Sequence, residues 1–135
     1  SGLFERGTVE KAYTADVWGK PNPPEGEIDL PLITDWPNRP RQKVDHETGK
    51  PSRTLYEVME HHADHARLRL TPLTGRSHQL RVHLAEIGHP ILGDRLYAHA
   101  AALAAAPRLH LHASELIFEH PVTGVRLTLT SPCPF

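Results

Sequence analysis

The chain has 135 residues, of which 39% are hydrophobic and 23% are charged, a composition typical of a folded domain with one hydrophobic core. Its formal net charge of −1 argues against indiscriminate binding to nucleic acids. The single cysteine, Cys133, excludes an internal disulfide and fits a reducing compartment. The most apolar stretch, residues 98–106, is too short to cross a bilayer, and no basic-then-apolar leader is present, so we expect a cytoplasmic protein without membrane contact.

Most of the predicted elements are strands. Val9, Ala15 and Val17 alternate with polar residues, which predicts a half-buried strand with Tyr13 on its apolar side. Strands are predicted at 28–33 and 41–46, around a turn at 36–40. Two hairpins are predicted, one of 54–58 and 67–73 around 61–65 and one of 109–118 and 125–130 around 120–124. A helix between Ser77 and Gly88 and a short helix at 98–106 complete the predicted elements. Since tight turns join most neighbouring strands, we expect an α+β domain with a mixed, mainly antiparallel sheet and one principal helix against one face.

The sequence TGRSHQLRVH at residues 74–83 is typical of a junction between a strand and a helix. Leu80 and Leu84 recur one helical turn apart, Ser77 is well placed as the N-cap, and Gly88 stops the helix.

Arg76, Gln79 and His83 share the face of this helix opposite its leucines. Such a stripe is compatible with an exposed polar helix side. It is equally compatible with an anion site, because Arg76 lies beside a glycine at the helix N-terminus, where free N–H groups and the positive helix end attract carboxylates and phosphates.

Positive charge is concentrated in residues 39–53, where five Lys or Arg face two Asp or Glu. Phosphate contacts are a natural use of such a segment. A solvated loop edge is the alternative interpretation.

Eleven histidines raise the possibility of a metal site. His78 and His83, however, lie five residues apart and diverge by about 140° on a helix, and no cysteine or carboxylate stands nearby at ligand spacing. We therefore expect no metal.

Three stretches resemble the RluA-type pseudouridine synthases, enzymes that isomerise uridine in ribosomal and transfer RNA. The string TGRSHQLRVH, followed by GHPILGDRLY at residues 88–97, resembles the family's C-terminal motif. Residues 4–13 resemble the segment with the active-site tyrosine, and residues 30–51 resemble the dual-specificity branch that acts on 23S rRNA and tRNA. The likeness spans nearly the whole chain.

The resemblance implies specific roles. A uridine flipped out of folded RNA would be held against aromatic and apolar groups, without cofactor or metal, and an arginine would keep a catalytic aspartate ionised. The implied catalytic residues are Tyr13 and Arg76, and the implied RNA-binding residues are Leu80, Gln79, Arg81, Arg39, Arg41 and Lys43. Judged on its strand alone, Tyr13 is more typical of an ordinary core aromatic, and the resemblance reverses this interpretation.

The family's nucleophilic aspartate lies in a His-Arg-Leu-Asp segment, and this sequence contains none. We therefore expect residues 1–135 to be the C-terminal portion of a catalytic domain, inactive alone and prone to associate through an exposed sheet edge. Asp94 is the nearest other carboxylate, and we expect it to order its loop. Two alternatives stay open: an RNA-binding module that never had a nucleophile, and a histidine-rich metal-binding structural domain.

Overall fold

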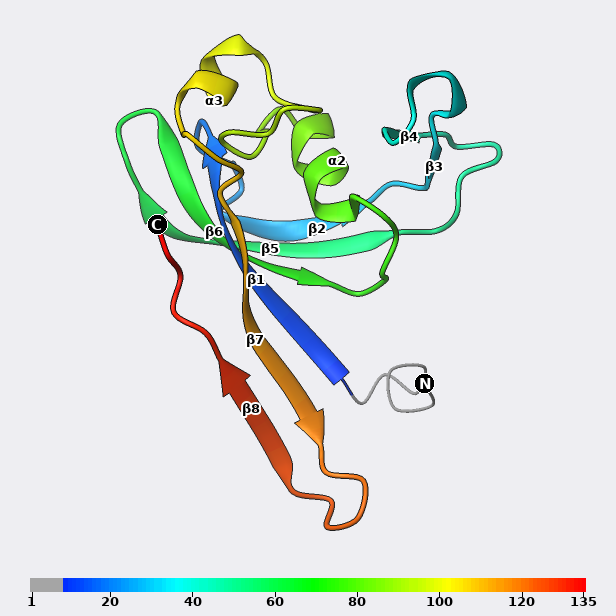
Figure 1. Ribbon diagram of the computed structural model, residues 1–135, viewed down its shortest axis with the longest axis vertical. Coiled ribbons are helices and arrows are strands. Elements are labelled where there is room, and N and C mark those ends of the chain that lie inside the picture. The colour runs from blue at the N-terminus through cyan, green and yellow to red at the C-terminus, as the bar shows by residue number, and fades with distance from the viewer. Residues whose placement is uncertain (1–8) are drawn as a thin grey trace.

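The computed structural model describes residues 9–135, so the family resemblance at residues 4–8 lies outside the described part. Six strands form one sheet in the order β2-β5-β6-β1-β7-β8 (Figure 1), and each neighbouring pair is antiparallel. The strands of this sheet are β1 (Val9–Trp18), β2 (Glu25–Asp29), β5 (Arg53–His61), β6 (His65–Pro72), β7 (Leu111–Glu119) and β8 (Arg126–Thr130). The expected α+β architecture is confirmed.

Helix α2 (Gln79–Glu86) lies against one face of the sheet, and the shorter α3 (Ala100–Ala104) packs beyond it (Figure 1). Leu68, Leu70 and Leu84 are fully buried where β6 meets α2. Burying a leucine contributes about 1.5–3 kcal/mol, so this apolar contact fixes the helix on the sheet. No helix within residues 9–135 is long and apolar enough to span a membrane.

The predicted strand 28–33 is divided in two. β2 ends at Asp29, and β3 (Leu32–Thr34) pairs instead with β4 (Gln42–Val44) in a separate two-stranded sheet. Pro31 stands between them, and since proline cannot donate a backbone hydrogen bond, it suits a break between two sheets. We call residues 31–50 the β3–β4 lobe; it projects beside α2 and contains the 3₁₀ turn η1 (Trp36–Asn38).

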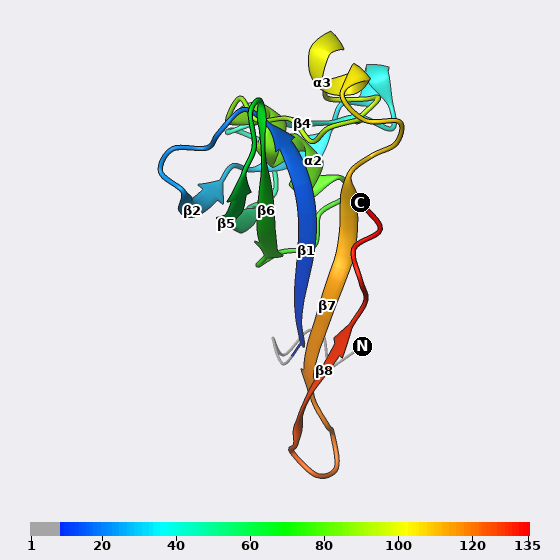
Figure 2. The same cartoon turned by 90° about the vertical axis from the view of Figure 1, so that its left-hand side faces the viewer.

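The last hairpin extends away from the rest of the domain. Figure 2 shows β7 and β8 running beyond the other strands. Every residue of β8 is exposed, and Leu127 and Leu129 are among its exposed apolar side chains. β8 is also the last strand of the sheet, so its outer edge presents unpaired backbone groups.

Asp16 departs from the alternation that defines β1. The pattern places it on the polar side, yet it is only 4% exposed, because Arg67 donates two hydrogen bonds to its carboxylate at 2.9 and 3.2 Å and His110 lies 3.0 Å from it. Burial by itself raises the pKa of this carboxyl, but the hydrogen bonds and charges of Arg67 and His110 outweigh burial and hold the pKa below its usual value.

Candidate active site

A cleft of about 620 Å³ opens between β1, the β6–α2 loop and α2. Tyr13 lines it from β1, Arg76 from the loop and Leu80 from the helix, and Leu109 and Leu111 add an apolar wall. Residues from four separate parts of the chain thus converge on one hollow. An apolar surface with a few polar groups is the usual character of a ligand site.

The charged residues that line this cleft are all cationic. They are Lys11, Arg76 and Arg81, and no described lining residue is an aspartate or glutamate. Arg81 is paired with a carboxylate outside the cleft. Arg76, by contrast, is exposed, and among residues 9–135 its guanidinium has one protein partner, the carbonyl of Pro51 at 3.2 Å. The cleft therefore favours an anionic partner for Arg76.

Gln79 shapes the turn that presents Arg76. Its amide donates to the carbonyl of Arg53 at 2.8 Å and to the Thr54 hydroxyl at 2.9 Å, and its carbonyl accepts from the Thr74 hydroxyl at 2.7 Å and the Arg76 N–H at 3.1 Å. Both donors and both lone pairs of the amide are thus used within the protein. The side chain holds the turn, and the direct RNA contact predicted for Gln79 stays a prediction.

The helix begins one residue later than predicted. α2 starts at Gln79, and the residue before it, His78, has a left-handed backbone with φ of 55° and makes no side-chain cap. Ser77 is exposed and caps nothing. The prediction of Ser77 as N-cap was wrong because the Gln79 N–H, which a cap at Ser77 would accept, donates instead to the carbonyl of Arg76 at 3.1 Å.

The predicted polar stripe is not an exposed face. His83 is fully buried, its Nε2 donates to the carbonyl of Leu30 at 2.9 Å, and its Nδ1 accepts from the Thr54 hydroxyl at 2.8 Å. Burial lowers the pKa of His83, which agrees with a neutral ring satisfied at both nitrogens. Together with Gln79, His83 fastens α2 to β5 and only Arg76 of the stripe faces outward.

Arg81 is held by a buried carboxylate. Asp94 is 0% exposed and accepts from Arg81 Nε at 3.0 Å and Nη2 at 2.7 Å. The same carboxylate accepts the N–H groups of Leu96 and Tyr97 at 3.0 and 3.2 Å. Asp94 therefore orders its loop, as expected, and Arg81 lines the cleft from a fixed position; its predicted contact with the RNA backbone stays a prediction.

Two residues absent from the sequence-based site join the cleft to the β3–β4 lobe. The hydroxyl of Tyr97 accepts the N–H of Gln42 at 2.9 Å and lies 2.8 Å from Nδ1 of His78. The hydroxyl is thus left to donate to His78, which places the imidazole proton on Nε2. Burial, assisted by the charge of Arg81, lowers the pKa of His78, so a neutral ring lines the cleft. Both residues stand in the family motif, His78 in TGRSHQLRVH and Tyr97 in GHPILGDRLY.

The basic residues of the lobe contact aromatic rings or solvent, whereas Arg53 of β5 forms an ion pair. Arg39 and Arg41 lie over aromatic rings, 4.0 Å from the centroid of Trp36 and 5.1 Å from that of Tyr97, and Arg41 also donates to the carbonyl of Leu96. Lys43 is exposed. No described carboxylate forms an ion pair with any of these three cations. Arg53, which the charge count placed with them, instead pairs with Glu27 at 2.6 Å.

The position of Tyr13 is compatible both with a core aromatic and with a residue of the site. It packs against the main hydrophobic core and also lines the cleft. No hydrogen bond joins its hydroxyl to another described residue. Within the same residues 9–135, no three His, Cys, Asp or Glu side chains converge in a way that could hold a metal ion.

Almost the whole chain matches curated relatives. The chain is 58% identical over 133 residues to the dual-specificity RNA pseudouridine synthase RluA of Escherichia coli (strain K12), and the match covers 98% of this chain and 61% of the relative. The protein of the same name from Vibrio vulnificus is 52% identical over 137 residues, covering 98% of this chain and 55% of that protein. The chain thus spans about three fifths of the length of these relatives.

Solved structures and a family comparison agree with the relatives. The human RNA pseudouridylate synthase domain containing 1 superposes with a TM-score of 0.83 at 31% identity, covering 99% of this chain and 58% of that one. The human RNA pseudouridylate synthase domain containing 4 superposes with a TM-score of 0.76 at 28% identity, covering 98% of this chain and 61% of that one. A sequence model of the family described as RNA pseudouridylate synthase matches residues 1–86, and the chain belongs to this family.

Proposed function

We propose that the protein to which this chain belongs isomerises uridine to pseudouridine in structured RNA, in 23S rRNA, the anticodon stem-loop of tRNA, or both. The observation that carries this proposal is the cationic cleft, which Arg76 and Tyr13 both line and in which Arg76 pairs with no carboxylate of residues 9–135. Family membership and relatives that bear the name of dual-specificity RNA pseudouridine synthases support it.

The reaction breaks the N-glycosidic bond of uridine, rotates the base and rejoins it to the ribose through carbon. A carboxylate must act at the ribose, and the target base must leave the RNA stack to be reached. In the cleft, Tyr13 offers an aromatic surface for the flipped base and Leu80 offers an apolar one.

Arg76 is proposed to pair with the catalytic carboxylate. The sequence contains no His-Arg-Leu-Asp segment, and the described lining of the cleft has no Asp or Glu, so we assign the nucleophile to a part of the protein outside residues 1–135. A guanidinium can bind a carboxylate through two parallel hydrogen bonds and favours its ionised form. Arg76 would also help to fill the gap that the flipped base leaves.

Contacts with RNA phosphates are assigned to the lobe and to the cleft. Arg39, Arg41 and Lys43 supply cations that form no ion pair with a carboxylate of residues 9–135, and Arg81 lines the cleft. Hydrogen bonding through Tyr97 holds the lobe at a fixed position relative to the cleft. One RNA could therefore contact both.

Substitution of Arg76 in the full-length enzyme tests the catalytic assignment. Removing one partner of a shielded charge pair typically costs about 3–5 kcal/mol, so Arg76→Ala should abolish turnover. Arg76→Lys should not restore it, because an ammonium cannot make the two-pronged contact. The measurement is the single-turnover rate of tritium release from labelled uridine at saturating enzyme.

Arg41→Ala is the matched control for charge. It should leave the single-turnover rate at saturation intact, weaken RNA binding, and reduce the salt dependence of binding by about one unit. Should Arg76→Ala react at the normal rate once the RNA is saturated, Arg76 is a phosphate contact and its catalytic assignment is wrong.

The isolated chain is expected to show no turnover in the same assay. Release of tritium above background by residues 1–135 alone would mean that the catalytic carboxylate lies within this sequence.

The exposed edge of β8, with Leu127 and Leu129, should also make the isolated chain associate. Light scattering that shows a strict monomer would contradict this. The cytoplasm, where free thiols such as Cys133 stay reduced, is the proposed compartment.

A further inference from the structure

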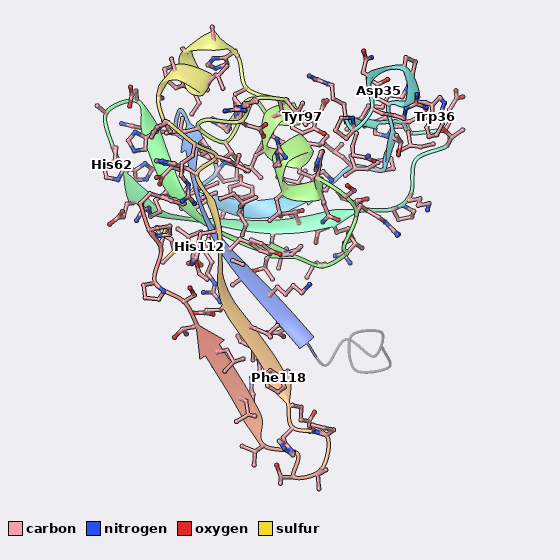
Figure 3. All side chains as sticks on the ribbon, viewed as in Figure 1. Asp35, Trp36, His62, Tyr97, His112 and Phe118 are labelled. Atoms are coloured by element: carbon pink, nitrogen blue, oxygen red, sulfur yellow. The ribbon has the colours of Figure 1, made fainter. Side chains whose placement is uncertain are left out.

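The β3–β4 lobe carries a large aromatic side chain in water. Trp36, in η1, is 67% exposed, and Figure 3 shows it on the outer part of the lobe, away from the helix and the main sheet. An indole is among the largest apolar groups in a protein and dominates the energetics of surfaces that bind partners. Neither the core nor the cleft explains its position.

Trp36 is held in place by the turn around it. Hydrogen bonds between backbone groups join Asp35 N to Arg41 O at 2.8 Å, Asn38 N to Asp35 O at 2.9 Å and Arg41 N to Asn38 O at 3.0 Å. The Asn38 amide also donates to the Asp35 carboxylate at 3.0 Å. A ring on such a cross-linked turn loses little conformational entropy on binding.

Cations lie along one side of the indole, while the Asp35 carboxylate of the same turn is held by the Asn38 amide. The guanidinium carbon of Arg39 lies 4.0 Å from the centroid of the ring, a distance typical of a cation–π contact. Arg41 and Lys43 follow on the strand side of the same lobe. An aromatic surface with cations along one side matches what single-stranded nucleic acids require, since bases stack on the ring and phosphates bind the cations.

On the basis of the RNA-modifying function above, we propose that Trp36 is a second base-binding site, at which an unpaired nucleobase of the substrate RNA stacks on the indole while the adjoining phosphates contact Arg39 and Arg41. This base is distinct from the uridine that enters the cleft. The lobe is joined to the cleft through Gln42, Tyr97 and His78, so one folded RNA loop could occupy both sites. Stacking without base-edge hydrogen bonds tolerates any base, which suits an enzyme with more than one RNA substrate.

Tryptophan fluorescence of the chain tests this directly. The sequence has two tryptophans, Trp18 and Trp36, so in a Trp18→Phe variant all indole emission comes from Trp36. We expect an RNA stem-loop with an unpaired loop to quench this emission, whereas inorganic polyphosphate and a fully paired RNA duplex should leave it nearly unchanged. Equal quenching by polyphosphate would overturn the proposal, because it would report binding at the cations without stacking.

Affinity gives the second measurement and needs no change at Trp18. Trp36→Ala should weaken stem-loop binding by about tenfold, within the range found for one stacked base, and leave the salt dependence of binding unchanged. Trp36→Phe should retain most of the affinity, whereas Arg39→Ala should reduce the salt dependence. Because Trp36 is largely exposed, its alanine variant should melt like the parent chain.

Unchanged affinity in Trp36→Ala would refute the stacking site. So would self-association or protein binding lost with Trp36 while RNA binding is kept, which would show a protein-docking surface. Failure of the proposed catalysis would give a different result from failure of the stacking site. In that case RNA would bind the full-length enzyme and quench the Trp36 emission, but no tritium would be released.

Discussion

The ion pair of Arg81 and Asp94 should be among the largest single contributions of a charged group to the stability of this domain. Asp94 is 0% exposed and accepts four hydrogen bonds, two from Arg81 and two from the backbone of residues 96 and 97. Asp94→Ala removes all four acceptors at once. It leaves a guanidinium whose side chain is only 18% exposed without its counter-charge.

Removing one member of a buried pair costs about 3–5 kcal/mol, and we expect a loss of this size in the free energy of unfolding. The Arg81 side chain is partly accessible to water, which favours the lower part of this range. The two N–H groups freed by the substitution lie in a loop that can open to solvent, so they add less than fully buried donors would. The measurement is urea unfolding followed by circular dichroism.

Glu27→Ala provides a control with the same local geometry. Glu27 also receives two hydrogen bonds from one arginine, at 3.1 and 2.6 Å from Arg53, but the side chains of this pair are 35% and 49% exposed. Water already solvates both charges, so the loss should be far smaller. If Asp94→Ala destabilises the chain no more than Glu27→Ala does, burial does not set the strength of these ion pairs.

Three further predictions concern His83, two glycines and Tyr13. Burial lowers the pKa of His83 in the folded state. The neutral ring should therefore contribute fully to the free energy of unfolding above the unfolded pKa near 6.5, and this contribution should decline as the pH falls below it. His83→Gln should flatten the pH dependence of the free energy of unfolding between about pH 7 and 5, and an unchanged slope would contradict the neutral buried ring. Gly93→Ala should unfold the chain at markedly lower temperature, since φ is +75° and a Cβ would collide with the carbonyl of Arg108. In Gly75→Ala the new Cβ meets no atom of residues 9–135 within 4 Å, so this variant should melt normally; equal melting of the two variants would disprove the close approach. In the full-length enzyme, Tyr13→Phe should keep RNA affinity through its ring while Tyr13→Ala loses it, and equal affinities in a filter-binding assay would exclude stacking on Tyr13.

Local pattern in the sequence predicted most of the framework. The alternation that includes Ala15 and Val17 predicted β1, and the turn residues between paired strands predicted the β5–β6 and β7–β8 hairpins. Leu80 and Leu84, one turn apart, gave α2. Such patterns are reliable here because the side-chain periods of strands and helices follow from backbone geometry alone. The family motif likewise located Arg76 and Tyr13, which the structure brings to one cleft.

The fate of the polar residues was decided only by the tertiary structure. Gln79, His83 and Asp16 all stand at positions that periodicity marks as outward, and all three are buried. Their partners come from distant segments: Thr54 lies 29 residues from His83, and His110 lies 94 residues from Asp16. A polar side chain can be buried only where another element supplies its hydrogen bonds, and periodicity shows which residues share a face without showing what covers that face. For the same reason the sequence pointed to five cations in residues 39–53, while the fold paired Arg53 with Glu27 and left Arg39 stacked on the exposed ring of Trp36.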